Sequence, residues 1–190
     1  SDKTIYNFTE MARNIGTFTA AGVELDTSAR AIKGIANLAA VSGSNSQQAA
    51  TAMYQLSQAL SSGTVKLMDW NSVVNAGMGG QVFQDALKDT ARVHGVAIDD
   101  MIKREGSFRN TLQNGWLSSE ILLETLSKFT GDLTAEQLTT MGYTEEQIAA
   151  IIKLGQTANN AATQVKTLTQ LKSTLLESMQ SGWTQTWEII

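Results

Sequence analysis

Apolar residues recur every three or four positions along most of the chain, which is the spacing of one face of an α-helix. The stretch from Gln48 to Lys88 shows this pattern most clearly. Three apolar stripes follow one another there: Ala49, Met53, Leu56 and Leu60; then Trp70, Val73 and Val74; then Val82, Phe83, Ala86, Leu87 and Ala91. Each stripe is typical of an amphipathic helix that buries one face against a neighbour. The stretch is therefore predicted to form three packed helices.

Glycine and polar residues separate these helices. The segment Ser61–Gly63 ends the first, and Gly63 suits the left-handed conformation that follows a last helical turn. A short extended piece, residues 64 to 67, then leads to Asp69, whose carboxylate can cap the next helix. The glycine-rich segment Gly77–Gly80 breaks the chain again. We interpret it as a hinge that lets two helices approach closely, because glycine accepts positive φ and has no side chain.

The residues before this stretch predict two more helices. The first covers residues 3 to 21 and ends at Gly22. The segment Asp26–Ser28 is expected to cap the second. The buried stripe expected on that second helix is made of Ala29, Ile32, Ala36 and Ala39. A polar turn over residues 42 to 46 follows, and its last members are expected to cap the helix that contains Ala49.

The residues after the central stretch predict short helices with clear boundaries. Ile98 begins one, with two aspartates in its first turn, where negative charge is favourable. Phe108, Leu112 and Trp116 are four apart, and the polar segment 118–120 opens a further helix that carries Leu122, Leu126 and Phe129. Capping boxes are expected at Thr134–Gln137 and at Thr144–Gln147.

From Ile148 to Met179 the apolar positions keep three-and-four spacing, over a length typical of a coiled-coil seam. Gly155 and the pair Asn159–Asn160 weaken the middle, so a kink or hinge is expected there. The predicted fold class is therefore all-α, a compact bundle of short helices followed by a long C-terminal helix. We place the bundle at residues 1–143 and the long amphipathic helix at residues 144–190.

Composition narrows the function. The chain has no proline, which suits a helical protein, and no cysteine, which excludes disulfides and thiolate zinc sites. The formal net charge is −4 and the largest basic cluster is the pair Lys103–Arg104, so the basic stripe of a nucleic-acid-binding protein is missing. No apolar run reaches the roughly 18 residues of a membrane span. The first residue is not Met and the last ones stop inside an apolar pattern, so we expect a piece of a longer protein.

Candidate chemistry is sparse, and we predict no enzyme activity, no cofactor and no catalytic, cofactor-binding or metal-binding residue. His94 is the single histidine and lies at a predicted helix end, where it favours a structural charge partner over a catalyst. Asp85, Asp89, Asp99 and Asp100 do not match a calcium loop. Gly77–Gly80 lacks the lysine and hydroxyl residue of a phosphate-binding loop. Trp183 and Trp187 share one helical face, as part of either a partner contact or a core interface.

Two segments resemble a known family. The run MYQLSQALSSGTVKLMDWNSVVNAGMGGQVFQDAL, residues 53–87, is similar to the tape measure domain of tailed-phage tail length proteins. In that family a QLSQALSSG-like helix end is followed by a polar turn and an N-G-containing helix. The run GSFRNTLQNGWLSSEILLETLSKFTG, residues 106–131, resembles the next block of the same family. The resemblance covers residues 30 to 135 and carries over no catalytic residue.

This resemblance implies a structural function. Such proteins lie extended inside the phage tail, set its length during assembly, leave with the DNA during infection and need no cofactor. The implied partners are tail tube subunits, tail assembly chaperones and tail tip proteins, and the implied locations are the virion tail lumen and the host cytoplasm during assembly. Self-association through the C-terminal helix is also expected. Two alternatives stay open: a helical interaction module of a bacterial or phage apparatus, and a cell-wall hydrolase module.

Overall fold

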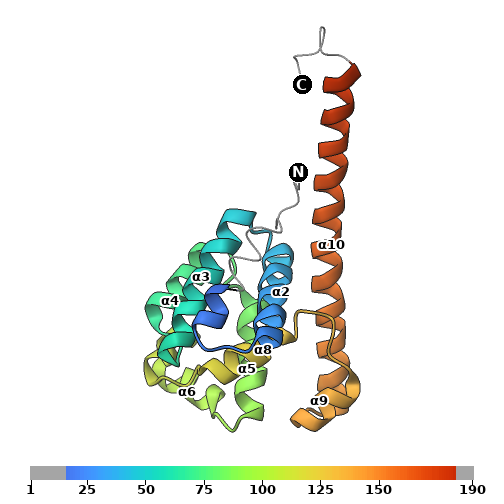
Figure 1. Ribbon diagram of the computed structural model, residues 1–190. Coiled ribbons are helices and arrows are strands. Elements are labelled where there is room, and N and C mark those ends of the chain that lie inside the picture. Colours follow the sequence, from blue (N-terminus) through green and yellow to red (C-terminus); the bar gives the residue numbers. More distant parts are fainter. Residues whose placement is uncertain (1–15, 183–190) are drawn as a thin grey trace.

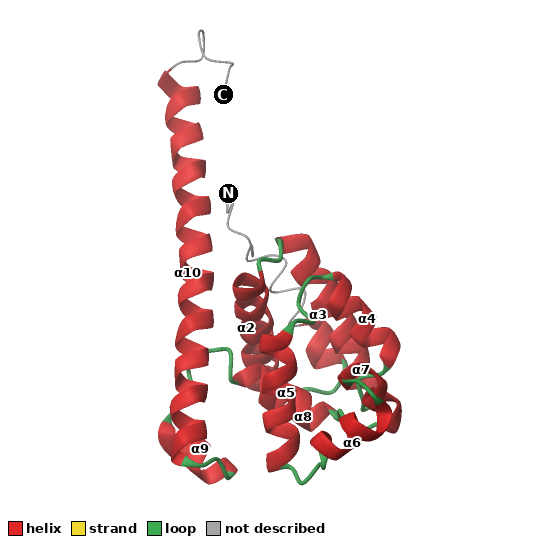
Figure 2. Ribbon diagram, turned by 180° about the vertical axis from the view of Figure 1, so that it is seen from behind, coloured by secondary structure: helices red, strands yellow, loops and turns green. Residues whose placement is uncertain are grey.

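The computed structural model describes residues 16–182, with side chains as far as Gln164, and this part of the chain is all-α as predicted. Figures 1 and 2 show a block of short helices with one long helix running beside it and continuing past it. The chain is helical over residues 16–20 and then forms α2 Leu25–Ser42, α3 Ser46–Ser62, α4 Leu67–Asn75, α5 Gln81–Val93, α6 Ile98–Glu105, α7 Phe108–Thr111, η1 Leu112–Asn114, α8 Ser119–Ser127, α9 Ala135–Met141 and α10 Glu145–Gly182. Within the described range, extended pairing is limited to an isolated bridge between Thr64 and Ser118.

Aromatic side chains form the centre of the main core. Trp70 packs on Phe83 and on Phe108, with ring centroids 5.8 and 5.2 Å apart. Phe83 continues the series to Phe129, and Phe108 continues it to Trp116. These rings come from α4, α5, α7 and the segments that flank α8, so one aromatic cluster joins helices that are far apart in sequence. Offset and edge-on ring pairs of this kind contribute about 0.5–1.5 kcal/mol each beyond their buried area.

Helices α2 and α8 approach closely at Gly34. A Cβ atom at this position would lie 2.1 Å from the carbonyl oxygen of Leu126. Only glycine therefore fits, and the backbones of the two helices are in direct contact. Gly34 lies inside a helical pattern, where glycine lowers helix stability. The close packing of the two helices compensates for this loss.

Most predicted helix boundaries are confirmed. Asn45 accepts from the backbone N–H of Gln48 at 2.8 Å, and the Gln48 side chain accepts from the backbone N–H of Asn45 at 2.8 Å. The capping boxes at 134–137 and 144–147 form in the same way. Gly63 has a φ of 91° and closes the last turn of α3, as expected.

Several local predictions are wrong. Helix α2 begins at Leu25 after Glu24, before the segment that was expected to cap it. Ser28 is buried and donates to the carbonyl of Val23, while Ala29 is exposed. The predicted first helix lies largely outside the described residues.

Helices α4 and α5 also depart in detail from the prediction. Asp69 sits at the third position of α4 and accepts from the backbone N–H of Lys66 at 3.0 Å, so it caps the helix from inside. Val74 and Val82 were expected in buried stripes but are exposed, because each lies on the outer side of its helix.

The predicted hinge at Gly77–Gly80 has a different physical basis at each glycine. Gly77 has a φ of 79°, which favours glycine. A Cβ atom at Gly79 would lie 2.5 Å from a methyl carbon of Val74, so the chain folds back on the end of α4. Gly80 has ordinary extended backbone angles and open space around it. The prediction that this position requires glycine is therefore wrong. This close contact joins Gly79 to Val74, five residues earlier in the chain, and it is not a contact between two helices.

Helix α10 runs unbroken for 38 residues, so the kink expected near Gly155 is wrong. Gly155 instead permits close packing, because its added Cβ would lie 3.0 Å from Gly131 and from the carbonyl oxygen of Lys128. Ala158 is fully buried in the main core, and the Asn37 amide donates to the Phe129 carbonyl at 2.8 Å beside it. The first turns of α10 thus pack on α2 and α9, and the remainder extends beyond the block (Figure 2).

Candidate functional site

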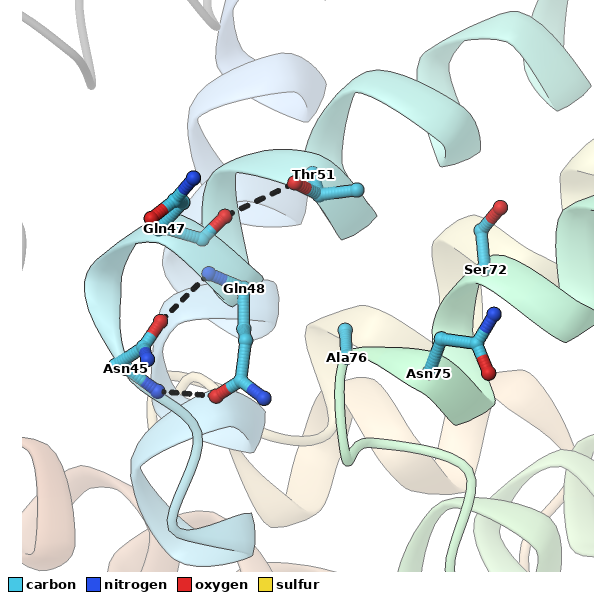
Figure 3. A pocket seen from close by; sticks show the side chains of 7 residues that line it. All are labelled: Asn45, Gln47, Gln48, Thr51, Ser72, Asn75 and Ala76. Carbon is cyan, nitrogen blue, oxygen red and sulfur yellow. Dashed lines mark hydrogen bonds between the residues drawn. The ribbon is translucent and has the colours of Figure 1, made fainter.

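A polar cavity lies between the start of α3 and the end of α4. It has a volume of about 280 Å³. Its lining is Asn45, Gln47, Gln48, Thr51, Ser72, Asn75 and Ala76, none of which is charged (Figure 3). Several of these polar groups are already bonded: Asn45 and Gln48 cap α3, and Thr51 donates to the Gln47 carbonyl. The cavity offers neutral hydrogen-bonding groups and can contact an uncharged polar surface.

A second site surrounds Lys128, directly after α8. Its side chain is only 2% exposed, and its Nζ lies 4.5 Å from the centroid of the Tyr143 ring. Among the described residues, this Nζ has no hydrogen-bond partner. Burial lowers the pKa of Lys128 to about 8, and the charges of Asp89 and Glu124 oppose this shift. A buried ammonium without a partner is unfavourable, and it marks the junction of α5, α8 and α10 as unusual.

Glu124 holds the same junction together. The hydroxyl of Tyr143 donates to its Oε2 at 2.7 Å, and Nε2 of His94 lies 2.9 Å from its Oε1. Burial, followed by the bond to Glu124, raises the pKa of Tyr143 well above its ordinary value. Both oxygens of the carboxylate are therefore engaged, so this arrangement links α5 and α8 to the segment that leads into α10.

The structure places Glu124 against His94. The two residues are 30 positions apart, so only the fold brings them together. The interpretation of His94 as a charge partner at a helix end fits its position directly after α5. The cluster of His94, Glu124, Tyr143 and Lys128 was not predicted, because no local spacing connects its members.

Of the aspartates that were considered as ligands, Asp85, Asp89 and Asp99 form salt bridges. Arg92 binds Asp89 at 2.6 Å and Asp99 at 2.8 Å. The hydrogen bond from Arg92 lowers the pKa of Asp99. Within the part of the chain that the structure describes, no group of three or more His, Cys, Asp or Glu side chains is arranged to hold a metal ion. Trp183 and Trp187 lie outside that part.

The glycine-rich segment that was considered as a phosphate cradle lies at the start of α5. Gly79 packs against Val74 of α4, and Gly80 directly precedes the first turn of α5. Along residues 16–182, no helix combines the length and the apolar character needed to cross a membrane.

Comparison with known proteins agrees with the sequence pattern. A family model described as "Tape measure protein" matches residues 1–148. No curated protein and no solved structure matches the chain. The matched region takes in the aromatic core, the polar cavity between α3 and α4, and the first turn of α10. The chain therefore belongs to the tape measure protein family, whose members are structural proteins of phage tails.

Proposed function

We propose that this chain is a non-catalytic segment of a tail tape measure protein that sets tail length and supports assembly of the tail tube. The observation that carries the proposal is the family match over residues 1–148. The long, unbroken α10 that follows the matched region supports it. The surface is compatible with a tail lumen, because the net charge is −4 and passing DNA would not be held by it.

The proposal divides the chain into two parts with different mechanical roles, at about residue 144. At about 1.5 Å per residue, the 38 residues of α10 span roughly 57 Å. Helices α2 to α8 fold back on one another around a common core, so they add little length for their number of residues. In this proposal α10 and its continuation act as the ruler, and the bundle acts as a folded block attached to it.

The proposed partners are tail tube subunits, tail assembly chaperones and tail tip proteins, inside the tail lumen and, during assembly, in the host cytoplasm. Copies of α10 are also proposed to associate with one another. The pattern that supports this runs through Val165, Leu168, Leu171, Leu175 and Met179. The later part of α10 extends beyond the bundle in both views (Figures 1 and 2).

Purified tails test the proposal. Mass spectrometry of tails from induced lysates should detect peptides of this chain in stoichiometric amounts, and cross-linking should connect them to tube subunits. A knockout should yield particles without tails of normal length. Recovery of the chain only in the soluble fraction, with normal tails in the knockout, would contradict the proposal.

A further inference from the structure

Asn114 and Gly115 form the turn that joins η1 to the segment before α8, and both residues are exposed. Within the part of the chain that the structure describes, the Asn114 side chain forms no hydrogen bond. The carboxamides of Asn37, Asn45 and Asn110, by contrast, are held by hydrogen bonds to the backbone. The carboxamide of Asn114 can therefore turn towards the backbone of the residue that follows it.

Gly115 leaves its own backbone nitrogen accessible to this carboxamide. It has a φ of 71°, and no other group lies within 4 Å of the place that a Cβ atom would occupy. Glycine has no side chain that shields the amide, and its backbone rotates with little restriction. The N–H of Gly115 donates to the Leu112 carbonyl at 3.2 Å, a long bond in a single 3₁₀ turn, so little holds the nitrogen in place. The sequence contains no other Asn-Gly pair.

We propose that Asn114 is a modification site, at which deamidation converts asparagine to aspartate and isoaspartate. The Gly115 nitrogen loses its proton to solvent base and attacks Cγ of Asn114. The N–Cγ bond forms, the carboxamide C–N bond breaks, and the amide nitrogen leaves as ammonia. Water then opens the resulting succinimide ring: cleavage of the new N–Cγ bond gives aspartate, and cleavage at the backbone carbonyl carbon gives isoaspartate. Water is the co-reactant, and each product carries one additional negative charge.

The two products have different effects on the neighbouring core. Isoaspartate directs the main chain through the side-chain methylene, so the backbone gains one carbon atom between positions 114 and 115. The residues that follow are closely held: Trp116 packs edge-on against Phe108, with ring centroids 5.8 Å apart, and the Leu117 carbonyl accepts from the N–H of Val65 at 2.8 Å. Isoaspartate should therefore displace the end of the aromatic cluster, whereas aspartate leaves the path of the chain unchanged.

Asn75 is a matched control within the same chain. It is exposed, lies at the end of α4 and forms no side-chain hydrogen bond among the described residues, but Ala76, which follows it, is buried and has a side chain. Peptide mass spectrometry of the full chain, sampled during incubation in mildly alkaline buffer, measures both rates. We expect Asn114 to deamidate at least about tenfold faster than Asn75. Equal rates at the two positions, or reaction at Asn75 alone, would overturn the proposal.

Thermal unfolding of the separated products tests the effect on the core. Ion-exchange chromatography isolates the deamidated chains by their added charge, and fragmentation in the mass spectrometer distinguishes isoaspartate from aspartate. The isoaspartate form should melt about 2–4 °C below the unmodified protein, and the Asn114→Asp variant should melt within about 1 °C of it. Asn114→Gln should keep its mass at this position through the same incubation, because its longer side chain cyclises less readily. An isoaspartate form as stable as Asn114→Asp would contradict the inferred displacement of the aromatic cluster, and loss of ammonia from Asn114→Gln at the wild-type rate would overturn the proposed reaction.

Discussion

Replacing Lys128 by methionine should make the protein more stable at neutral pH. Methionine has a similar length and shape but no charge, so it fills the same space at the junction of α5, α8 and α10. The pKa of Lys128 is lowered from 10.5 to about 8. At about 1.4 kcal/mol per pKa unit, this difference corresponds to roughly 3 kcal/mol of unfavourable free energy when the folded protein carries the charge. Loss of the contact with the Tyr143 ring offsets about 1 kcal/mol, so the expected net gain is about 2 kcal/mol.

The lowered pKa of Lys128 also determines how the free energy of unfolding changes with pH. Below pH 8 the lysine is protonated in both the folded and the unfolded state, and the full penalty is present. Between pH 8 and pH 10.5 the unfolded chain still binds the proton while the folded protein has lost it, so the wild-type free energy of unfolding rises with pH. The advantage of Lys128→Met should therefore shrink steadily through this window.

Urea denaturation of both proteins between pH 6 and pH 10 measures this difference directly. Subtracting the two curves removes the contributions of the other titrating groups, including Tyr143. Lys153→Met controls for the loss of a lysine from the surface, and it should change stability by less than about 0.5 kcal/mol. If Lys128→Met is less stable than the wild type at pH 7, with a difference that does not vary with pH, the reasoning about the buried ammonium is refuted.

Three further outcomes are expected. Gly34→Ala should lower the free energy of unfolding by about 3 kcal/mol in urea titrations, because its methyl group meets backbone of α8, and an unchanged midpoint would contradict the close helix contact. Gly79→Ser should lower the free energy of unfolding by about 1–2 kcal/mol, while Gly80→Ser should change it by less than about 0.5 kcal/mol. Equal melting temperatures for the two variants would contradict the distinction between these glycines. The purified protein should not clear bacterial cell walls, and His94→Ala should behave like the wild type; clearing that disappears on replacement of a glutamate by glutamine would indicate a hydrolase.

The parts of this fold that the sequence predicts well are local. Helix caps such as Asn45 with Gln48 depend on residues three positions apart, and the stripe that contains Met53 depends on spacing within one helix. Both can be identified without knowing which helices become neighbours. The same reasoning places the last long helix, whose beginning is fixed by a capping box.

The contacts that the sequence could not predict are those between distant segments. Gly155 indicates a kink when its helix is considered alone, and only the loop at Gly131 explains why glycine is needed in a straight helix. In the sequence alone, Lys128 is a positive charge at a helix end, which is favourable. Its burial cannot be predicted, because the burial depends on Tyr143 and on α10. The candidate site at this junction is formed by three helices, α5, α8 and α10, and by the segment that holds Tyr143, so local spacing carries no signal for it.

Tail length in phage that carry deletions tests the central claim, a folded block followed by an extended ruler. Deleting residues 163–180 removes 18 residues, or about five helical turns, from the part of α10 beyond the bundle, and should shorten the tail by about 27 Å. Deleting α4, Leu67–Asn75, should unfold the block and abort assembly. Electron micrographs of both mutants give the answer. Tails of unchanged length after the first deletion, or viable phage with proportionally shorter tails after the second, would contradict the account.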